Sequence, residues 1–186
     1  EEDLPVSEEH CQKPISLYGI HKQTAENYCK LYERTFNLKS VILRLPQVYG
    51  PSLTNEDTYS IINKFIGKAM QNEMLYVNGF GQDIKDIIYI DDVANLIIKI
   101  LESKIDKGIF NVGSGQKVKL IEIAEKIVKL CKSGSFKAVP FPPNLEKFEL
   151  GSFYFDISKV KKTFNWEPQT SIEEGIKKTV EFYKKG

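Results

Sequence analysis

Two side chains near the start of the sequence have the types and the spacing of an acid–base pair. Tyr18 and Lys22 are four residues apart, so they lie on one face if their segment is helical. An ammonium beside a phenol favours the phenolate, which makes a tyrosine a usable general base near neutral pH. Tyrosine and lysine also fall four apart by chance on many helices. The spacing alone therefore leaves two interpretations open, a catalytic pair and two ordinary surface side chains.

The segment around this pair has the pattern of a helix followed by a strand. Ser16 is a suitable helix cap, and five residues after it fall on one helical face: Ala25, Tyr28, Cys29, Tyr32 and Phe36. We expect a helix over residues 17–36. The apolar run at 40–45, which Pro46 and then Gly50-Pro51 end, predicts a buried strand. A helix, a short loop and an apolar strand in this order are typical of an α/β protein.

The rest of the chain continues this alternation. Helices are predicted at 61–70, from Asp91 and Asp92 onward, at 120–131, and after the caps at 156–159 and 171–174; strands are predicted at 74–77, 84–90 and 108–113. The glycines of 78–81 permit positive φ, so the strands on either side are expected to form a hairpin. A carboxylate at 91 or 92 is placed to accept free amide hydrogens at the start of its helix. The proline-rich stretch 133–155 is expected to be mostly loop.

Composition and charge exclude several classes of protein. The chain has 186 residues, enough for one domain, and its 26 basic and 25 acidic side chains give a net charge of +1. That balance favours neither a nucleic acid nor an anionic membrane as partner. No apolar run approaches the roughly 18 residues of a membrane-spanning helix. Three cysteines without metal-ligand spacing favour a reducing cytoplasm, and no metal site is expected.

Five short segments follow one another in an order that is more specific than any one of them. They are Ser-Leu-Tyr-Gly-Ile-His-Lys at 16–22 with Glu26 after it, Leu-Arg-Leu-Pro-Gln-Val-Tyr-Gly-Pro at 43–51, Lys-Asp-Ile-Ile-Tyr-Ile-Asp-Asp-Val at 85–93, Phe-Asn-Val-Gly-Ser-Gly at 110–115, and Asp-Ile-Ser-Lys at 156–159 with Asn-Trp-Glu-Pro at 165–168. This order resembles the extended short-chain dehydrogenase/reductase superfamily. Within it, the segments are most similar to the branch of nucleotide-sugar epimerases and dehydratases.

The resemblance implies a redox mechanism on bound NAD. Tyr18 would take the proton of a sugar hydroxyl while hydride passes to NAD, and Lys22 would hydrogen-bond the nicotinamide ribose. Tyr18, Lys22 and Pro46 are the residues that the resemblance places at the cofactor. The keto-sugar is then either turned over and reduced on its other face, which is epimerisation, or it first loses water, which is 4,6-dehydration.

The same resemblance implies a UDP- or dTDP-sugar as substrate. Gln47 stands where the family commonly has an asparagine near the sugar nucleotide, and Lys85 where an arginine usually meets the diphosphate. Lysine keeps the charge but loses the bidentate fork, so a looser phosphate contact is expected. Lys147 stands where some relatives have a second nucleotide-binding arginine. Each has an alternative: Gln47 could satisfy loop backbone, and the two lysines could be solvated surface charges.

The resemblance covers most of the chain but only the C-terminal portion of the family pattern. The glycine-rich dinucleotide fingerprint and the Ser or Thr that partners the tyrosine are not in this sequence. We therefore expect 1–186 to be a single α/β unit of a larger enzyme, the C-terminal part of a doubly wound parallel, Rossmann-like sheet with a small mixed α/β substrate-binding subdomain. Residues 16–50 would end the Rossmann part, and 51–186 would be mostly subdomain, with a returning Rossmann strand near 108–113.

The expected function is that of an NAD-dependent nucleotide-sugar epimerase, with this portion inactive alone. Residues 150–154 resemble epimerase-like members more than the dTDP-glucose dehydratases. A 4,6-dehydratase of the same family remains an alternative. So does a non-catalytic relative that binds a nucleotide sugar or a protein. The departures at Gln47, Lys85 and Ser152 favour this alternative, and the intact Tyr18/Lys22 pair counts against it. In this family the helix of the tyrosine commonly joins a dimeric helix bundle, so a homodimer through 17–36 is expected.

Overall fold

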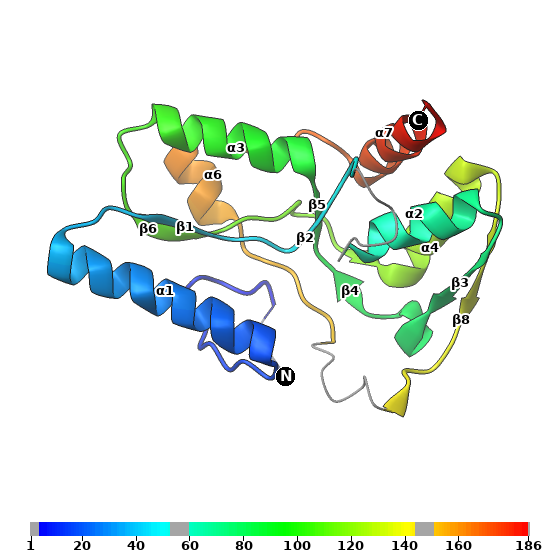
Figure 1. Ribbon diagram of the computed structural model, residues 1–186, viewed down its shortest axis with the longest axis horizontal. Helices are drawn as coiled ribbons and strands as arrows, with labels where there is room; N and C mark the ends of the chain where they lie inside the picture. The colour runs from blue at the N-terminus through cyan, green and yellow to red at the C-terminus, as the bar shows by residue number, and fades with distance from the viewer. Residues whose placement is uncertain (1–3, 53–59, 144–150, 186) are drawn as a thin grey trace.

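The structure is a computed structural model that describes residues 4–52, 60–143 and 151–185. Figure 1 shows the arrangement of its helices and strands. In chain order they are α1 (Leu17–Phe36), β1 (Val41–Arg44), β2 (Gln47–Tyr49), α2 (Ile61–Met70), β3 (Met74–Val77), the 3-10 helix η1 (Asn78–Gly81), β4 (Ile84–Lys85), β5 (Ile87–Tyr89), α3 (Ile90–Glu102), β6 (Gly108–Asn111), β7 (Val118–Lys119), α4 (Leu120–Cys131), β8 (Ser135–Ala138), α6 (Ser158–Phe164) and α7 (Ile172–Lys185).

The strands pair in four two-stranded ladders. Three of them are parallel: β1 pairs with β6, β2 with β5, and β3 with β8. The fourth, β4 with β7, is antiparallel. Parallel neighbours need a crossover connection, and here the crossovers contain the helices. The prediction of an α/β fold with parallel strands is confirmed.

The predicted hairpin around 78–81 is wrong. Gly79 and Phe80 do have positive φ, of 62° and 55°, and they form the tight turn of η1. After this turn, however, the chain does not return along β3. Strand β3 pairs with β8, and the strand after the turn, β4, pairs with β7. The positive φ values therefore mark a change of direction between two ladders.

One further strand prediction needs correction, and one short strand lies where mostly loop was predicted. The strand expected over 84–90 is interrupted at Asp86 between β4 and β5, and its last residue belongs to α3. The stretch 133–155, expected to be mostly loop, contains β8, whose four residues are all exposed. An exposed strand of this kind has no alternation of buried and exposed positions to reveal it.

The buried apolar side chains form two clusters. One lies among β3, β5, α2, α4 and α7 and is centred on residues with no exposed surface, such as Ile62, Ile66 and Ile123. The other lies among β5, β6, α3 and α6 and includes Phe110 and Trp166. Figure 1 shows α1 on one side of the β1–β6 ladder and α3 with α6 on the other.

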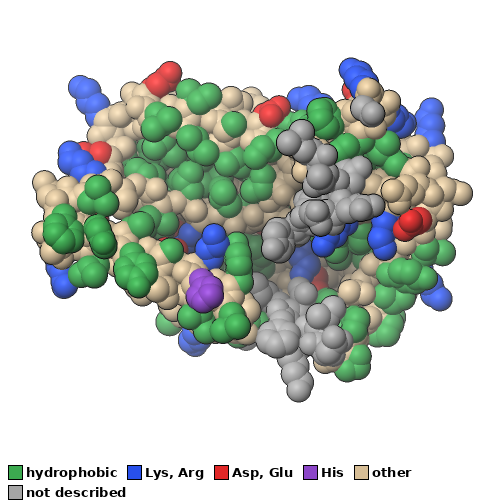
Figure 2. Space-filling view, viewed as in Figure 1, with side chains coloured by type: hydrophobic (Ala, Val, Ile, Leu, Met, Phe, Trp, Pro, Cys, Tyr) green, Lys and Arg blue, Asp and Glu red, His purple; other side chains and the backbone are tan. Residues whose placement is uncertain are grey.

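Helix α1 has the predicted bounds, and the face that its periodic residues share is largely exposed. Glu26 is its only buried residue, whereas Tyr28 is 60% exposed and Phe36 is 68% exposed. Strand β1, expected to be buried, is half-buried along its length. An apolar groove of about 520 Å³ lies beside β1, and Val41, Leu43, Ile97, Ile100, Leu101 and Ile105 are among the residues that line it. Figure 2 shows hydrophobic side chains gathered along α1 and in the hollow between α1 and α3.

Candidate functional site

Tyr18 and Lys22 lie together in the first two turns of α1. The Ser16 hydroxyl caps this helix by accepting a hydrogen bond from the Gly19 amide at 3.1 Å, which fixes where the first turn starts. The Lys22 Nζ atom lies 5.2 Å from the centre of the Tyr18 ring. The Tyr18 side chain is 72% exposed, so its hydroxyl is accessible. In Figure 1 this end of α1 is the one nearer β4.

Gln47 and Lys85 meet at a pocket of about 280 Å³. Gln47 opens β2 and Lys85 ends β4, so two different ladders supply them. The other residues lining the pocket are apolar or amide side chains and one carboxylate: Ile61, Asn78, Asp86, Leu120, Phe141 and Phe153. The lining thus combines one cation, one carboxylate, two aromatic rings and two amide side chains, and of these the cation and the rings suit a ligand with a phosphate and a ring.

The Lys85 ammonium is held in place by its surroundings. Its Nζ donates to the Gly151 carbonyl at 3.1 Å and lies 3.7 Å from the Asp83 carboxylate. The side chain is only 21% exposed. An ammonium has three donors, so these contacts orient the charge at the pocket wall. A solvated surface lysine, the alternative interpretation of Lys85, would be more exposed than this.

Asp86, next to Lys85, is 2% exposed. Its carboxylate accepts hydrogen bonds from the Ser114 amide at 3.1 Å, the Ser114 hydroxyl at 3.3 Å and the Phe155 amide at 3.1 Å. Burial raises the pKa of the Asp86 carboxyl above its ordinary value, and the three hydrogen bonds oppose that rise. Asp86 therefore joins the β4–β5 break to two segments that are distant in the sequence.

Two other residues predicted from the sequence for the site, Pro46 and Lys147, are not among the described residues that line the pocket of Lys85. Pro46 lies half-buried in the link between β1 and β2, just before Gln47. Lys147 lies outside the described residues. Sequence reasoning did not select Phe141 or Phe153 for the site. The run of three aromatic residues at 153–155 was the available signal for Phe153, whereas Phe141, between two prolines, gave none.

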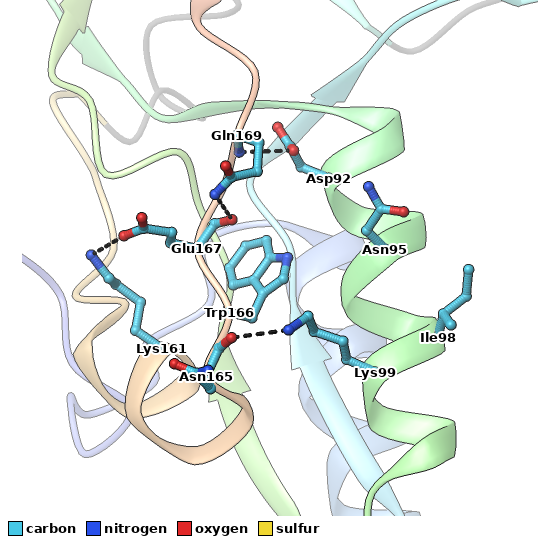
Figure 3. Close-up of a pocket in the computed structure, with 9 residues that line it drawn as sticks. All are labelled: Asp92, Asn95, Ile98, Lys99, Lys161, Asn165, Trp166, Glu167 and Gln169. Carbon is cyan, nitrogen blue, oxygen red and sulfur yellow. Dashed lines mark hydrogen bonds and ion pairs between the residues drawn. The ribbon is translucent and has the colours of Figure 1, made fainter.

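A larger pocket, of about 620 Å³, lies between α3 and the segment before α7 (Figure 3). Its polar groups are largely bonded to one another: Lys99 Nζ donates to the Asn165 carbonyl at 3.0 Å, and Lys161 pairs with Glu167 at 3.0 Å. Asp92, expected to accept amide hydrogens of its own helix, accepts those of Gln169 and Thr170 at 2.9 and 3.1 Å. These bonds attach the C-terminal segment to α3, and they indicate a structural role.

No helix within the described ranges is long and apolar enough to cross a membrane. No group of three or more His, Cys, Asp or Glu side chains within them could hold a metal ion.

Comparison with known proteins identifies the family. Residues 1–113 match the sequence model of the NAD dependent epimerase/dehydratase family. The chain belongs to this family. It is 33% identical over 187 residues to a UDP-glucuronate 4-epimerase of Thermodesulfobacterium geofontis, with 98% of the chain and 53% of the relative covered.

Two other family members extend the comparison. One is a trifunctional UDP-glucose 4,6-dehydratase/UDP-4-keto-6-deoxy-D-glucose 3,5-epimerase/UDP-4-keto-L-rhamnose-reductase of Arabidopsis thaliana, 29% identical over 185 residues, with 98% of the chain and 27% of the relative covered. The other is the structure of a UDP-glucuronic acid 4-epimerase from Bacillus cereus in complex with UDP-glucuronic acid and NAD. It superposes with a TM-score of 0.87 at 26% identity, and the match covers all of this chain and 58% of that one. The chain thus spans little more than half the length of the single-activity epimerases it matches.

NAD is the cofactor of this family, and the residues present fit one end of it. The Tyr18 hydroxyl makes no hydrogen bond within the described part of the chain, and the Lys22 ammonium beside it can donate to hydroxyl groups. This donor set suits a ribose and a nicotinamide. The sequence holds no glycine-rich turn for the pyrophosphate, so the fit extends only to that end.

Proposed function

We propose that this chain is the proton-transfer and substrate-binding part of an NAD-dependent nucleotide-sugar 4-epimerase. The observation that carries the proposal is the Tyr18–Lys22 pair, with its ammonium 5.2 Å from the ring centre, in a chain whose family is NAD dependent. Epimerases among the relatives support the choice of this reaction.

In this proposal the chain's own residues move a proton and hold the sugar nucleotide. When bound, NAD supplies the acceptor and later the donor of hydride. Tyr18 acts as the general base that takes the proton of the sugar 4-hydroxyl and returns it on reduction. The Lys22 ammonium, which lies over the Tyr18 ring, would stabilise charge on the Tyr18 oxygen and donate to the ribose hydroxyls of bound NAD, and Pro46 would lie at its nicotinamide side.

The substrate end of the proposal rests on the 280 Å³ pocket. We propose that Lys85 contacts the diphosphate and that Phe153 and Phe141 pack against the base of a UDP- or dTDP-sugar. Gln47 then lies where its amide can bond the sugar or the nucleotide. Because all these residues belong to this chain, the pocket binds UDP without the cofactor.

Three further proposals concern the whole protein. Residues 16–50 belong to the cofactor half, and 51–186 mostly to the substrate half, with β6 returning to pair with β1. The exposed apolar face of α1 forms a homodimer interface, which we expect because Tyr28, Leu31 and Tyr32 would otherwise remain exposed. The 186 residues alone do not turn over substrate, since Tyr18 at 72% exposure is not enclosed.

Turnover of UDP-glucose and UDP-glucuronate by the full-length protein tests the mechanism. Tyr18→Phe should lower kcat by about 10²–10⁴, the usual contribution of a general acid–base group, with the UDP dissociation constant unchanged. Tyr28→Phe removes a hydroxyl from another exposed tyrosine of α1 and should leave both unchanged. Full turnover by Tyr18→Phe would exclude the proposed role.

A 4,6-dehydratase is the second candidate, because the Arabidopsis relative carries that activity. The two differ in product, since the dehydratase releases water and leaves a 4-keto-6-deoxy sugar. Product analysis by NMR separates them: a 4-epimer supports the epimerase, and a keto sugar supports the dehydratase.

A further inference from the structure

Asp86 is a buried charge in the pocket wall to which the proposed mechanism assigns no role. At 2% exposure it would cost stability unless its oxygens were bonded, and all three donors that bond it come from other segments. Two belong to Ser114, in the turn after β6. The third is the amide of Phe155, in the segment that carries Phe153.

These bonds fix the aromatic wall of the pocket from both sides. The Phe153 amide donates to the Ile84 carbonyl at 2.9 Å, just before Lys85. The Phe155 amide donates to the Asp86 Oδ2 atom, just after Lys85. The segment with Phe153 is therefore held alongside β4 by contacts one residue before and one residue after the cation.

The other side of Asp86 is equally constrained. The backbone carbonyl of Asp86 accepts a hydrogen bond from the backbone amide of Gln47 at 3.4 Å. A Cβ atom added to Gly113 would lie 2.3 Å from its Oδ2 atom, so the turn after β6 packs directly on the carboxylate. Asp86 thus connects the backbone of Gln47, the 113–114 turn and the segment of Phe153.

We propose that Asp86 is a positioning residue of the nucleotide pocket. Its carboxylate holds the 153–155 segment and thereby sets the place of the Phe153 ring relative to the Lys85 ammonium. This inference rests on the proposed function, because it assumes that the ring and the ammonium contact the base and the diphosphate. Asp86 acts through these residues, since its own oxygens are engaged by amides and a hydroxyl.

Two other roles for Asp86 predict different results. If it served only as a negative charge, its removal would tighten the binding of a diphosphate. If it served only stability, its loss would resemble that of Asp92. Asp92 is also 2% exposed, and its carboxylate accepts hydrogen bonds from two backbone amides. Unlike Asp86, it lies away from the nucleotide pocket and attaches the C-terminal segment to α3 (Figure 3). Asp92→Asn is therefore a matched control for Asp86→Asn.

The experiment is an NMR titration of the 186-residue chain and its variants with UDP, uridine and inorganic diphosphate, with urea unfolding in parallel. Asp86→Asn should weaken UDP and uridine by about tenfold, equal to about 1.4 kcal/mol, and should not weaken diphosphate. Lys85→Met should weaken UDP and diphosphate but not uridine. Asp92→Asn should lower the free energy of unfolding about as much as Asp86→Asn does. It should leave the affinities for UDP, uridine and diphosphate unchanged.

A second variant keeps the test decisive if Asp86→Asn does not fold. Ser114→Ala removes the hydroxyl that bonds Asp86 and should weaken uridine by about threefold, as expected for one lost hydrogen bond. Equal uridine affinities in wild type and both variants, or tighter UDP binding by Asp86→Asn, would overturn the positioning role alone. No binding of UDP by the wild-type chain would overturn the substrate site and the positioning role together.

Discussion

Replacement of Arg44 by methionine is expected to loosen α1 from the rest of the molecule. Glu26 is the only buried residue of this 20-residue helix. Arg44, at the end of β1, donates to both carboxylate oxygens of Glu26, from Nε at 2.7 Å and from Nη2 at 2.8 Å. Gln12 adds a third bond to the same carboxylate at 3.0 Å. This ion pair is therefore the main buried contact of the helix that carries Tyr18.

The magnitude follows from what the substitution leaves behind. The Glu26 and Arg44 side chains are only 10% and 17% exposed, so Arg44→Met leaves a carboxylate buried without its cation. Breaking a buried pair in this way costs about 3–5 kcal/mol, a large part of the roughly 5–15 kcal/mol by which a domain is stable. The double variant Glu26→Leu with Arg44→Met removes both charges and should recover most of the loss.

Urea unfolding followed by circular dichroism measures the loss, and hydrogen exchange assigns it to the amides of α1. Lys39→Met is the control, because Lys39 pairs with Asp106 at the surface, where ion pairs contribute about 0–1 kcal/mol. If Arg44→Met costs no more than this control, or if the double variant costs the sum of the two single ones, the reasoning about the buried pair is refuted.

The same pair predicts a pH dependence. The two hydrogen bonds from Arg44 are the main reason that the pKa of Glu26 lies below its ordinary value of 4.5, and burial opposes them. A carboxyl whose pKa is lower in the folded state stabilises the fold above its unfolded pKa and loses that contribution as pH falls. The difference in unfolding free energy between wild type and Arg44→Met should therefore shrink below about pH 4.5. A constant difference down to pH 3 would contradict this.

Two other predictions concern packing. Tyr28→Asp should lower the mass measured by light scattering from two chains to one, because this side chain is 60% exposed and lies on the proposed interface. Tyr28→Phe should keep the dimer, and a dimeric Tyr28→Asp would exclude α1 as the interface. Gly175→Ala should lower the free energy of unfolding in urea by about 1–3 kcal/mol, because the added Cβ would lie 2.3 Å from the Tyr49 hydroxyl oxygen. Adding Tyr49→Phe removes that oxygen and should recover part of the loss. No recovery would place the strain elsewhere.

Local patterns predicted the helices well and the strand pairings poorly. The bounds of α1 follow from the Ser16 cap and the period of its side chains, both of which act within a few residues. Periodicity groups residues on a face but does not say what covers that face, so the exposure of Tyr28 and Phe36 could not be derived. The hairpin prediction was wrong because β3 pairs with β8 and β4 with β7, two partners that are distant in the sequence and that local patterns do not reveal.

In the candidate site, too, local features could be predicted from the sequence and long-range contacts could not. Tyr18 and Lys22 could be predicted because their four-residue spacing is local. The position of Lys85 beside Gln47 follows only from the pairing of β2 with β5, whose first register pair joins Gln47 to Ile87. Phe141 enters the pocket from a proline-rich segment after β8. No rule of spacing relates this ring to a residue of β2.

The pattern of strand pairing has a consequence for the order in which the molecule assembles. None of the described ladders joins two strands that are neighbours in the sequence; Val41 pairs with Gly108, and Met74 with Ser135. During synthesis on the ribosome, β1 therefore cannot pair until β6 has been made, and β3 cannot pair until β8 has been made. Until then the backbones of β1 and β3 are unpaired and their apolar side chains remain exposed. Contacts of this range slow folding, because each requires the closure of a long loop before it stabilises anything. Refolding in the range of milliseconds to seconds is expected, and chains stopped before residue 135 would be prone to aggregate.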